Sequence, residues 1–394
     1  MRIALVHMRQ AQAGGTERYL NHLARHLAQR GDEVTIVCRS REEAPHPSVR
    51  FELLRPLAIG SAWRLSSFAK AVEEHVRTAS YELVYGLGKG WAQDVVRLGG
   101  GLHATYLDLA HEATRSGWKR FVPGSDLKHK LALAAESRAL RSRELVRIVV
   151  NARMVQHDAM ARYDLPEERF RLVYNGTDLE RFHPRRRASD GAALRKANAI
   201  EPDAPVVLFL GSGYGRKGLD RVLEAFAELR RGRPAARLLV AGYDSQQASF
   251  ERRAADLGLS EAVRFLGGRR DAEVCFAAAD VYVLPTRYDP FANTTLEALA
   301  SGLPVITTRG NGAHELIEER VHGSVLDSAE DELGLALALA WWLEPATLAR
   351  GRLAARALAE QHSAESKMQQ SAAILDEALA EKRRRAGKSS ESVS

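Results

Sequence analysis

One stretch, Leu284 to Glu318, limits what this chain can fold into, because its residue pattern predicts a strand–loop–helix–strand unit. An apolar strand over 281–284 stops at a proline, a helix begins near Asn293 and ends at a glycine, and residues 305–308 form the next strand. Units of this kind build parallel sheets that are covered by helices. The pattern therefore predicts an α/β fold.

Two carboxylates within this stretch point to a ligand. Asp289 lies in the loop and Glu297 lies on the helix just after it. A ligand at the carboxyl edge of a parallel sheet would meet both side chains, together with the free N–H groups of the helix start. A lone glutamate near a helix start is usually there because the helix dipole favours it. The longer string that contains both acids, DPFANTTLEALASGLPVI, makes a binding site the better interpretation.

This string resembles the signature of retaining glycosyltransferases of the family-4 type, which have the GT-B fold. The signature has an acid, seven other residues, a Glu, an Ala-rich turn and Gly-x-Pro-Val. Its first acid is usually Glu and is Asp289 here, which keeps the charge on a shorter side chain. The resemblance implies that Asp289 binds hydroxyls of the sugar and that Glu297 binds the ribose. It also assigns Phe291, Asn293 and Thr294 to the donor site.

A chain of 394 residues that alternates strands and helices is long enough for two domains. The resemblance implies two Rossmann-like domains that face a cleft, with the nucleotide sugar held mainly by the second. We predict an acceptor domain over 1–178, a linker over 179–204, a nucleotide-sugar domain over 205–345, a helix over 346–380 that returns to the first domain, and a disordered tail over 381–394.

The second domain begins with a strand and a glycine-rich loop, GSGYGRKGLDRVLEAF, which runs from Gly211. Neither the P-loop motif nor the dinucleotide fingerprint is complete in it. In the enzymes that this chain resembles, the loop supplies an Arg and a Lys, here Arg216 and Lys217, to a nucleoside diphosphate. Two cations above a helix start would neutralise the phosphates and the charge that grows on a leaving diphosphate. Arg269, in the string GGRRD, is expected to contact the base or ribose.

The first domain contributes a second glycine loop and a histidine. A glycine pair before a helix forms either a tight turn or an anion pocket, and we expect Thr16 to N-cap that helix. The loop resembles the N-terminal glycine loop of the same enzymes, which implies that Gly14, Gly15 and Glu17 contact the donor. His103 follows three glycines in RLGGGLHATY. It is either a hydrogen-bonded structural residue or, as the resemblance implies, a side chain on the reacting face.

The formal charge of +7 is concentrated in two segments. Residues 111–147 carry nine Lys or Arg against four Asp or Glu, and residues 381–394 carry five against two. Trp118 and Phe121 lie beside cations of the first segment, and an amphipathic helix follows. This pattern suits an anionic membrane surface. An ordinary solvated helix with a leucine stripe toward the core fits the pattern equally well.

The resemblance is strongest to cytoplasmic enzymes that glucosylate a heptose of the lipopolysaccharide core. It implies retaining transfer of a hexose, glucose in those relatives, from a nucleoside diphosphate sugar, with UDP as the expected nucleotide, to a glycan or lipid-linked acceptor. The residues assigned to catalysis are His103, Arg216, Lys217 and Asp289. No acceptor base is evident, and the enzymes that this chain resembles are thought to use the leaving phosphate.

Other classes of protein share parts of this pattern. A nucleotide-sugar 2-epimerase has the same architecture and remains open, although the acid-x7-Glu string favours transfer. A nicotinamide oxidoreductase would need a complete glycine fingerprint. A nucleic-acid-binding protein would need a known module or aromatic platform, and neither is present. No Asp-x-Asp occurs, so we expect no metal and no cofactor. Two cysteines in separate apolar segments and no apolar run of membrane-spanning length predict a cytoplasmic protein, peripheral on the inner membrane if the basic segment docks there.

Overall fold

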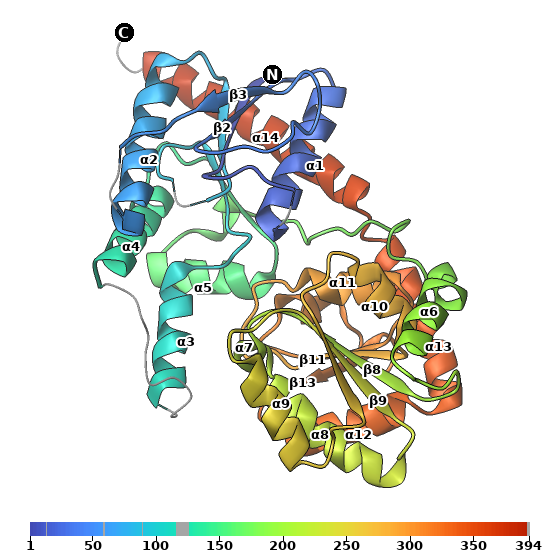
Figure 1. The fold of residues 1–394 in the computed structure, drawn as a ribbon. Helices are drawn as coiled ribbons and strands as arrows, with labels where there is room; N and C mark the ends of the chain where they lie inside the picture. The colour runs from blue at the N-terminus through green and yellow to red at the C-terminus, as the bar shows by residue number, and fades with distance from the viewer. Residues whose placement is uncertain (13, 58–59, 89, 116–125, 392–394) are drawn as a thin grey trace. The chain divides into compact units, whose positions relative to one another are not determined.

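The computed structural model describes residues 1–12, 14–57, 60–88, 90–115 and 126–391, and the chain divides into two units. The first unit contains Met1–Tyr174 together with Glu365–Ser394, and the second unit contains Asn175–Ala364. Each unit has a parallel sheet with helices on both of its faces (Figure 1). The predicted α/β class is therefore confirmed for both halves of the chain.

The sheet of the first unit has the strand order β3-β2-β1-β4-β5-β6-β7, and all its neighbouring strands are parallel. Its strands are β1 (Arg2–Val6), β2 (Glu33–Cys38), β3 (Arg50–Leu53), β4 (Leu83–Gly86), β5 (Val95–Arg97), β6 (Arg147–Val150) and β7 (Phe170–Leu172). Its helices are α1 (Gly15–Gln29), α2 (Gly60–Thr78), α3 (His103–Arg115), α4 (Asp126–Leu140), α5 (Arg153–Tyr163), the short η1 (Glu167–Arg169) and α14 (Ala364–Glu391).

Both faces of this sheet are buried, because alternate residues of β1 enter different clusters. Ile3 and Leu5 pack with the leucines of α1 and with α14 residues such as Leu375, whereas Ala4 and Val6 pack against α2. Successive side chains of a strand point to opposite faces, so a strand that is covered on both sides is apolar throughout. The C-terminal helix is thus part of the core of the first unit.

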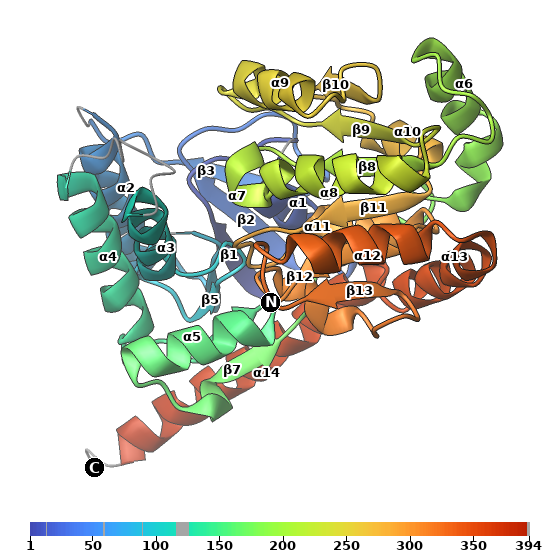
Figure 2. The same ribbon diagram turned by 90° about the horizontal axis from the view of Figure 1, so that it is seen from below.

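The second unit has the strand order β10-β9-β8-β11-β12-β13 in one parallel sheet. Its strands are β8 (Val206–Leu210), β9 (Arg237–Ala241), β10 (Val263–Gly267), β11 (Val281–Leu284), β12 (Val305–Thr308) and β13 (Gly323–Leu326). Its helices are η2 (Pro184–Ala188), α6 (Asp190–Ala197), α7 (Tyr214–Lys217), α8 (Leu219–Gly232), α9 (Gln247–Asp256), α10 (Ala272–Ala278), α11 (Asn293–Ala300), η3 (Gly312–Leu316), α12 (Glu332–Trp342) and α13 (Pro345–Glu360). Figure 2 shows α8 and α12 running side by side over one face of this sheet.

Two segments differ from the sequence-based expectation. Residues 179–204, predicted as a linker, contain η2 and α6, and the segment belongs to the second unit. It is polar because its arginines are used in ion pairs: the Arg195 guanidinium, itself buried, donates to the Asp280 carboxylate at 2.9 Å. Residues 381–391, predicted to be disordered, continue α14, where Lys382 donates to Asp94 at 2.8 Å.

Two features of the chain concern contact with a membrane: the length and apolarity of its helices, and the position of the basic segment over 111–147. Within the residues that the structure describes, no helix is both long enough and apolar enough to cross a membrane. The basic cluster proposed to dock on a membrane includes Trp118, Lys119, Arg120 and Phe121, which lie outside the described residues. Lys128 and Lys130 of the same segment are exposed on α4.

Candidate active site

The candidate site of the second unit lies where the strand order of its sheet reverses. β8 is followed in the chain by its neighbour β9 on one side, whereas its other neighbour, β11, comes later. Ligands of open α/β sheets bind outside the carboxyl ends of the strands at such a switch point. The loop from Gly211 to Lys217 leaves the carboxyl end of β8, and the loop that carries Asp289 leaves that of β11. The two predicted motifs therefore meet at one edge.

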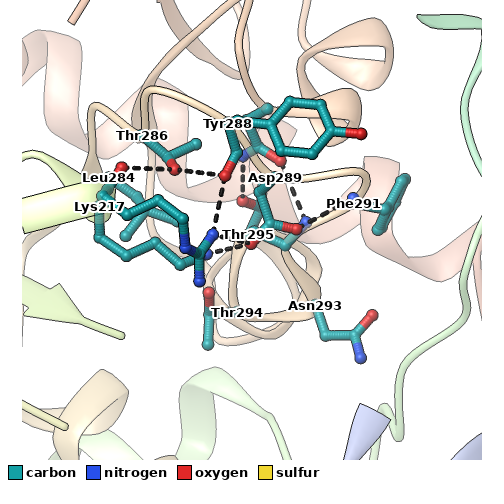
Figure 3. Close-up of polar contacts among 12 residues, drawn as sticks. Lys217, Leu284, Thr286, Tyr288, Asp289, Phe291, Asn293, Thr294 and Thr295 are labelled. Carbon is teal, nitrogen blue, oxygen red and sulfur yellow. Dashed lines mark hydrogen bonds and ion pairs between the residues drawn. The ribbon is translucent and has the colours of Figure 1, made fainter. Parts of the chain in front are cut away.

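Lys217 and Asp289 are in direct contact, although 72 residues separate them. The Lys217 ammonium donates to Asp289 Oδ2 in an ion pair drawn in Figure 3, and only 8% and 15% of the two side chains are exposed. The sequence predicted Lys217 to be a loop cation, and it is instead the last residue of the short helix α7 and is buried. Burial lowers the pKa of Lys217; the charge of Asp289 offsets part of this, and Arg216 adds to it.

Arg216 occupies the solvent side of the same pair. Its Nη1 donates to the Tyr288 carbonyl at 2.7 Å and lies 3.6 Å from Asp289 Oδ2, and 43% of its side chain is exposed. The site thus offers one shielded and one accessible cation around a single carboxylate. A diphosphate bound here could contact both cations, and charge-assisted hydrogen bonds are the stronger kind.

Gly218 allows the loop to pass close to the next strand. It has φ +80°, and a Cβ at this position would lie 2.2 Å from the Pro285 carbonyl oxygen. Only glycine adopts such a backbone freely, and no side chain fits at that distance. The glycine therefore lets α7 lie against the start of the Asp289 loop, and this brings Lys217 to the carboxylate.

Asp289 is held by its own loop and by the segment after β12. Its Oδ1 accepts the Phe291 N–H at 3.0 Å, and its backbone N–H donates to the Gly310 carbonyl at 2.8 Å. Asn311, fully buried, accepts from Ala292 N–H at 3.1 Å and donates to Thr295 Oγ1 at 3.0 Å. We did not identify Asn311 from the sequence. The available signal was a polar residue just after the carboxyl end of a strand.

The start of α11 carries the other predicted donor contacts. Glu297 lies in the second turn and is 5% exposed, Phe291 is buried just before the helix, and both have interactions within the chain. Asn293 accepts from the Asn175 side chain at 2.6 Å, and Thr294 accepts from the Tyr282 hydroxyl. These residues share one edge of the sheet with Asp289.

Two further predicted donor residues lie nearby in the fold. Gly211 directly follows β8, and a Cβ there would be in ordinary contact with the Lys217 stem. Arg269 follows β10 at the edge of the sheet and pairs with Asp271, its Nη2 lying 2.6 Å from the carboxylate. A ligand that used Arg269 would have to share its guanidinium with Asp271.

The glycine loop of the first unit occupies the matching position in its sheet. It follows the carboxyl end of β1, beside the switch between β1 and β4. The helix that follows begins at Gly15 with Gly14 as its N-cap at φ +111°, so the prediction that Thr16 caps it is wrong. The Glu17 carboxylate folds back over Gly14 and lies 3.4 Å from Arg9 Nη2. The sequence alone did not identify Arg9 as part of this cluster.

His103 is the first residue of α3 and is held by two residues of α4. Its backbone N–H donates to Glu136 Oε2 at 2.6 Å, and its Nε2 lies 3.1 Å from His129 Nδ1. Tyr163 also donates to Glu136, at 2.7 Å. Burial raises the pKa of the Tyr163 hydroxyl, as do its hydrogen bond to the Glu136 carboxylate and the charge of that group. His103 therefore forms hydrogen bonds within the first unit, as its structural interpretation predicted. Its contact with substrate stays a prediction.

The residues assigned to the site belong to both units. Gly14, Gly15, Glu17 and His103 lie in the first, and the others lie in the second. In the described part of the chain, no group of three or more His, Cys, Asp or Glu side chains is placed to hold a metal ion.

Two parallel-sheet α/β units, each with a glycine loop at its switch point, define the GT-B class of glycosyltransferase fold. Residues 190–388 match the family model of glycosyl transferases group 1, and residues 13–181 match that of glycosyltransferase family 4. The chain belongs to the glycosyl transferases group 1 family, and it is a glycosyltransferase.

Named relatives agree with this family. The chain is 28% identical over 349 residues to a D-inositol 3-phosphate glycosyltransferase of Mycobacterium sp. (strain KMS), covering 80% of this chain and 74% of the relative. It is 26% identical over 317 residues to the lipopolysaccharide glucosyltransferase WaaG of Escherichia coli (strain K12), covering 79% and 82%. A crystal structure of WaaG, a glycosyltransferase involved in lipopolysaccharide biosynthesis, has a TM-score of 0.77 at 25% identity and covers 95% of this chain and 99% of that one.

Proposed function

We propose that this protein transfers a hexose from a nucleoside diphosphate sugar to a hydroxyl of a glycan or glycolipid, with retention of configuration. The proposed donor is UDP-glucose, from which glucose is transferred, and the proposed acceptor is a sugar of the lipopolysaccharide core. Similarity to a lipopolysaccharide glucosyltransferase supports this choice. The single observation that carries the proposal is the meeting of Arg216, Lys217 and Asp289 at the switch point.

In the proposed reaction, the two cations act on the leaving group. As the bond between the sugar and the diphosphate breaks, negative charge grows on the diphosphate oxygens. Arg216 and Lys217 already carry positive charge at that position, so little reorganisation is needed when the charge develops. Lys217 is shielded from water, and its electrostatic effect is correspondingly stronger than that of an exposed lysine.

The roles proposed for Asp289 and Glu297 follow from their position on this edge of the second sheet, whereas His103 belongs to the first unit and its role is proposed from the family resemblance. Asp289 would bind hydroxyls of the sugar, Glu297 would accept from the ribose hydroxyls, and His103 would line the reacting face. The departing phosphate would take the proton of the acceptor hydroxyl. We further propose that the reaction needs no metal, since the sequence lacks Asp-x-Asp, and turnover in EDTA tests this point directly.

The proposal is tested by product analysis with purified enzyme, UDP-glucose and an acceptor glycan. Transfer gives an α-linked product from this donor, whereas a 2-epimerase would release a different hexose and no glycoside. Lys217→Met should lower kcat/KM at least tenfold, which is a loss of about 1.4 kcal/mol. If the cation acts on the leaving group, the loss should reach about 2–4 kcal/mol. Lys196→Met, at an exposed position on α6, is the matched control and should leave kcat/KM unchanged. Full turnover in a folded Lys217→Met enzyme would remove this residue from the mechanism.

A further inference from the structure

The first unit contains a cavity of about 750 Å³ at the edge of its sheet that is opposite to the glycine loop. Its lining includes Tyr81, Asp94 and Val146, which lie just before β4, β5 and β6. The glycine loop follows the carboxyl end of β1, and all strands of the sheet are parallel. The cavity is therefore separate from the candidate active site, and none of the residues assigned to that site lines it.

Basic side chains from three helices and one connecting segment converge on this cavity. The five basic residues are Arg77 of α2, Arg138 of α4, Arg143 of the segment after α4, and Lys382 and Arg385 of α14. The lining has three acidic residues, which are Glu73, Asp94 and Glu144. The lining therefore has a net positive charge, which favours an anionic ligand.

The ion pairs within the chain leave this positive charge only partly compensated. A single oxygen, Glu73 Oε1, accepts from both Arg77 at 2.8 Å and Arg138 at 2.7 Å. The other oxygen of Glu73 accepts from the Trp91 indole at 2.8 Å. Arg143 forms no ion pair with any residue that the structure describes. An anion that entered the cavity would give Arg77 and Arg138 a second partner and would pair with Arg143.

The cavity is larger than a bare phosphate needs, and its other walls carry polar groups among apolar side chains such as Val76 and Val84. Its volume lies within the range of small-molecule sites. The Arg138 guanidinium lies 4.5 Å from the centroid of the Trp91 ring, so this aromatic side chain is fixed at the wall. Gln93, Ser142 and Glu144 add amide, hydroxyl and carboxylate groups. Such groups pair with the hydroxyls of a sugar ring.

We propose that this cavity is a second binding site, for a phosphorylated saccharide. The phosphate binds among Arg77, Arg138 and Arg143, and the sugar hydroxyls contact the polar wall. The cavity also includes Lys382 and Arg385 near the end of α14, so the bound ligand fixes that end of the helix against the sheet. This site does not depend on the donor site of the second unit or on the reaction proposed for it.

Calorimetric titration of the full-length protein with glucose 6-phosphate, in excess UDP, tests the proposal. UDP occupies the donor site if the proposed function is correct, so the remaining binding reports the cavity. The exposed pair Arg77→Ala/Arg143→Ala should weaken this binding at least tenfold, because two charge-assisted contacts are lost. Lys70→Ala removes an exposed cation from the same helix outside the cavity and should change binding less than twofold.

Tryptophan fluorescence locates the ligand independently. Saturation with glucose 6-phosphate should change the emission of the protein, and Trp91→Phe should abolish this change. Inorganic phosphate should bind more weakly and glucose should not bind. Equal binding of the double variant and the wild type would overturn the proposal, and so would complete loss of binding when UDP is added. Equal affinity for inorganic phosphate would leave no role for the saccharide and overturn the assignment of ligand class.

Discussion

Asp289→Asn should destabilise the second unit strongly, because it removes the only carboxylate that the described structure pairs with Lys217. The lysine would remain buried, with Arg216 adding to the positive charge around it. Breaking a buried ion pair from one side costs about 3–5 kcal/mol. Because 15% of the Asp289 side chain is exposed, we take the lower end, about 3 kcal/mol. For a unit of this size, that corresponds to a fall in Tm of about 6–12 °C.

A double-mutant cycle separates the ion pair from other effects of the substitution. Lys217→Met keeps an unbranched side chain and removes the charge. In Asp289→Asn, the amide oxygen can still accept the Phe291 N–H that Asp289 Oδ1 accepts at 3.0 Å. The double variant Lys217→Met/Asp289→Asn has no buried unpaired charge, so it should melt higher than Asp289→Asn alone. We expect a coupling energy of about 2 kcal/mol.

The pH dependence has a definite sign. The pKa of Lys217 in the folded chain is already lowered by burial, and loss of Asp289 removes a charge that raises it. Between that lowered value and the unfolded value of about 10.4, the unfolded chain binds more protons, so the unfolding free energy rises with pH. The Tm deficit of Asp289→Asn relative to wild type should therefore narrow as the pH is raised from 7 toward about 10.

Thermal melts of the four proteins, followed by calorimetry at a series of pH values, measure both quantities. Lys196→Met serves as a control for loss of an exposed lysine and should melt with the wild type. Additive Tm changes in the cycle would contradict the ion pair. A deficit that does not change with pH would show that the buried charge is not its cause.

Three other predictions follow from particular residues. Glu297→Gln should weaken binding of free UDP about tenfold, since an amide accepts fewer hydrogen bonds than a carboxylate, and isothermal titration against exposed Glu261→Gln as control measures this. Gly218→Ala should lower Tm by an amount equivalent to about 3 kcal/mol, because of its φ of +80° and the 2.2 Å approach to a carbonyl, whereas Gly232→Ala, with open space around it, should change stability by less than about 1 kcal/mol. Binding of the protein to anionic vesicles should fall as salt is raised, and it should be absent on neutral vesicles. Neutral substitution of Lys119, Arg120, Lys128 and Lys130 should abolish this binding without loss of donor hydrolysis. Vesicle sedimentation of that variant measures this.

The sequence predicted the elements of the second sheet well where apolar runs end at proline or glycine. The strands over 281–284 and 305–308 and the start of the helix at Asn293 agree with the structure. Each is bounded by a residue with a backbone preference that is visible locally, such as Gly302 at φ +74° after the helix. The polar residues at the carboxyl ends of these strands could be placed on one edge for the same reason.

The partners of the site residues could not be predicted in this way. Lys217 and Asp289 were assigned separately to the diphosphate and the sugar, and their mutual contact joins positions 72 residues apart. The burial of Lys217 also depends on the close packing of Gly218 against Pro285, which no local pattern reveals. Asn311 escaped notice because its buried hydrogen bonds use backbone and hydroxyl groups from neighbouring segments.

The predicted linker over 179–204 and the predicted disordered tail from residue 381 are both folded for the same physical reason, which is the pairing of their cations with carboxylates elsewhere in the fold. A prediction from composition assumes that arginine and lysine side chains face the solvent. This assumption fails where the fold places a carboxylate beside them. Arg187, Arg195 and Arg352 all converge on Asp280, which is buried and also accepts the Val206 N–H. A buried carboxylate with several donors can keep a polar segment folded, because removing it would leave cations without partners.

The end of α14 is also held by an ion pair to a carboxylate of the sheet, but its ion pairs differ in how exposed they are to solvent. Lys382 pairs with Asp94, which is 10% exposed, whereas the Arg384 pair with Glu381 lies on the helix surface. Surface pairs contribute little, so the local charges alone would not hold this helix, as the composition indicated. The contact with Asp94 crosses 288 residues and joins the helix to the start of β5. A run of charges in a sequence therefore predicts disorder only where no acidic residue at a sheet edge can form an ion pair with it.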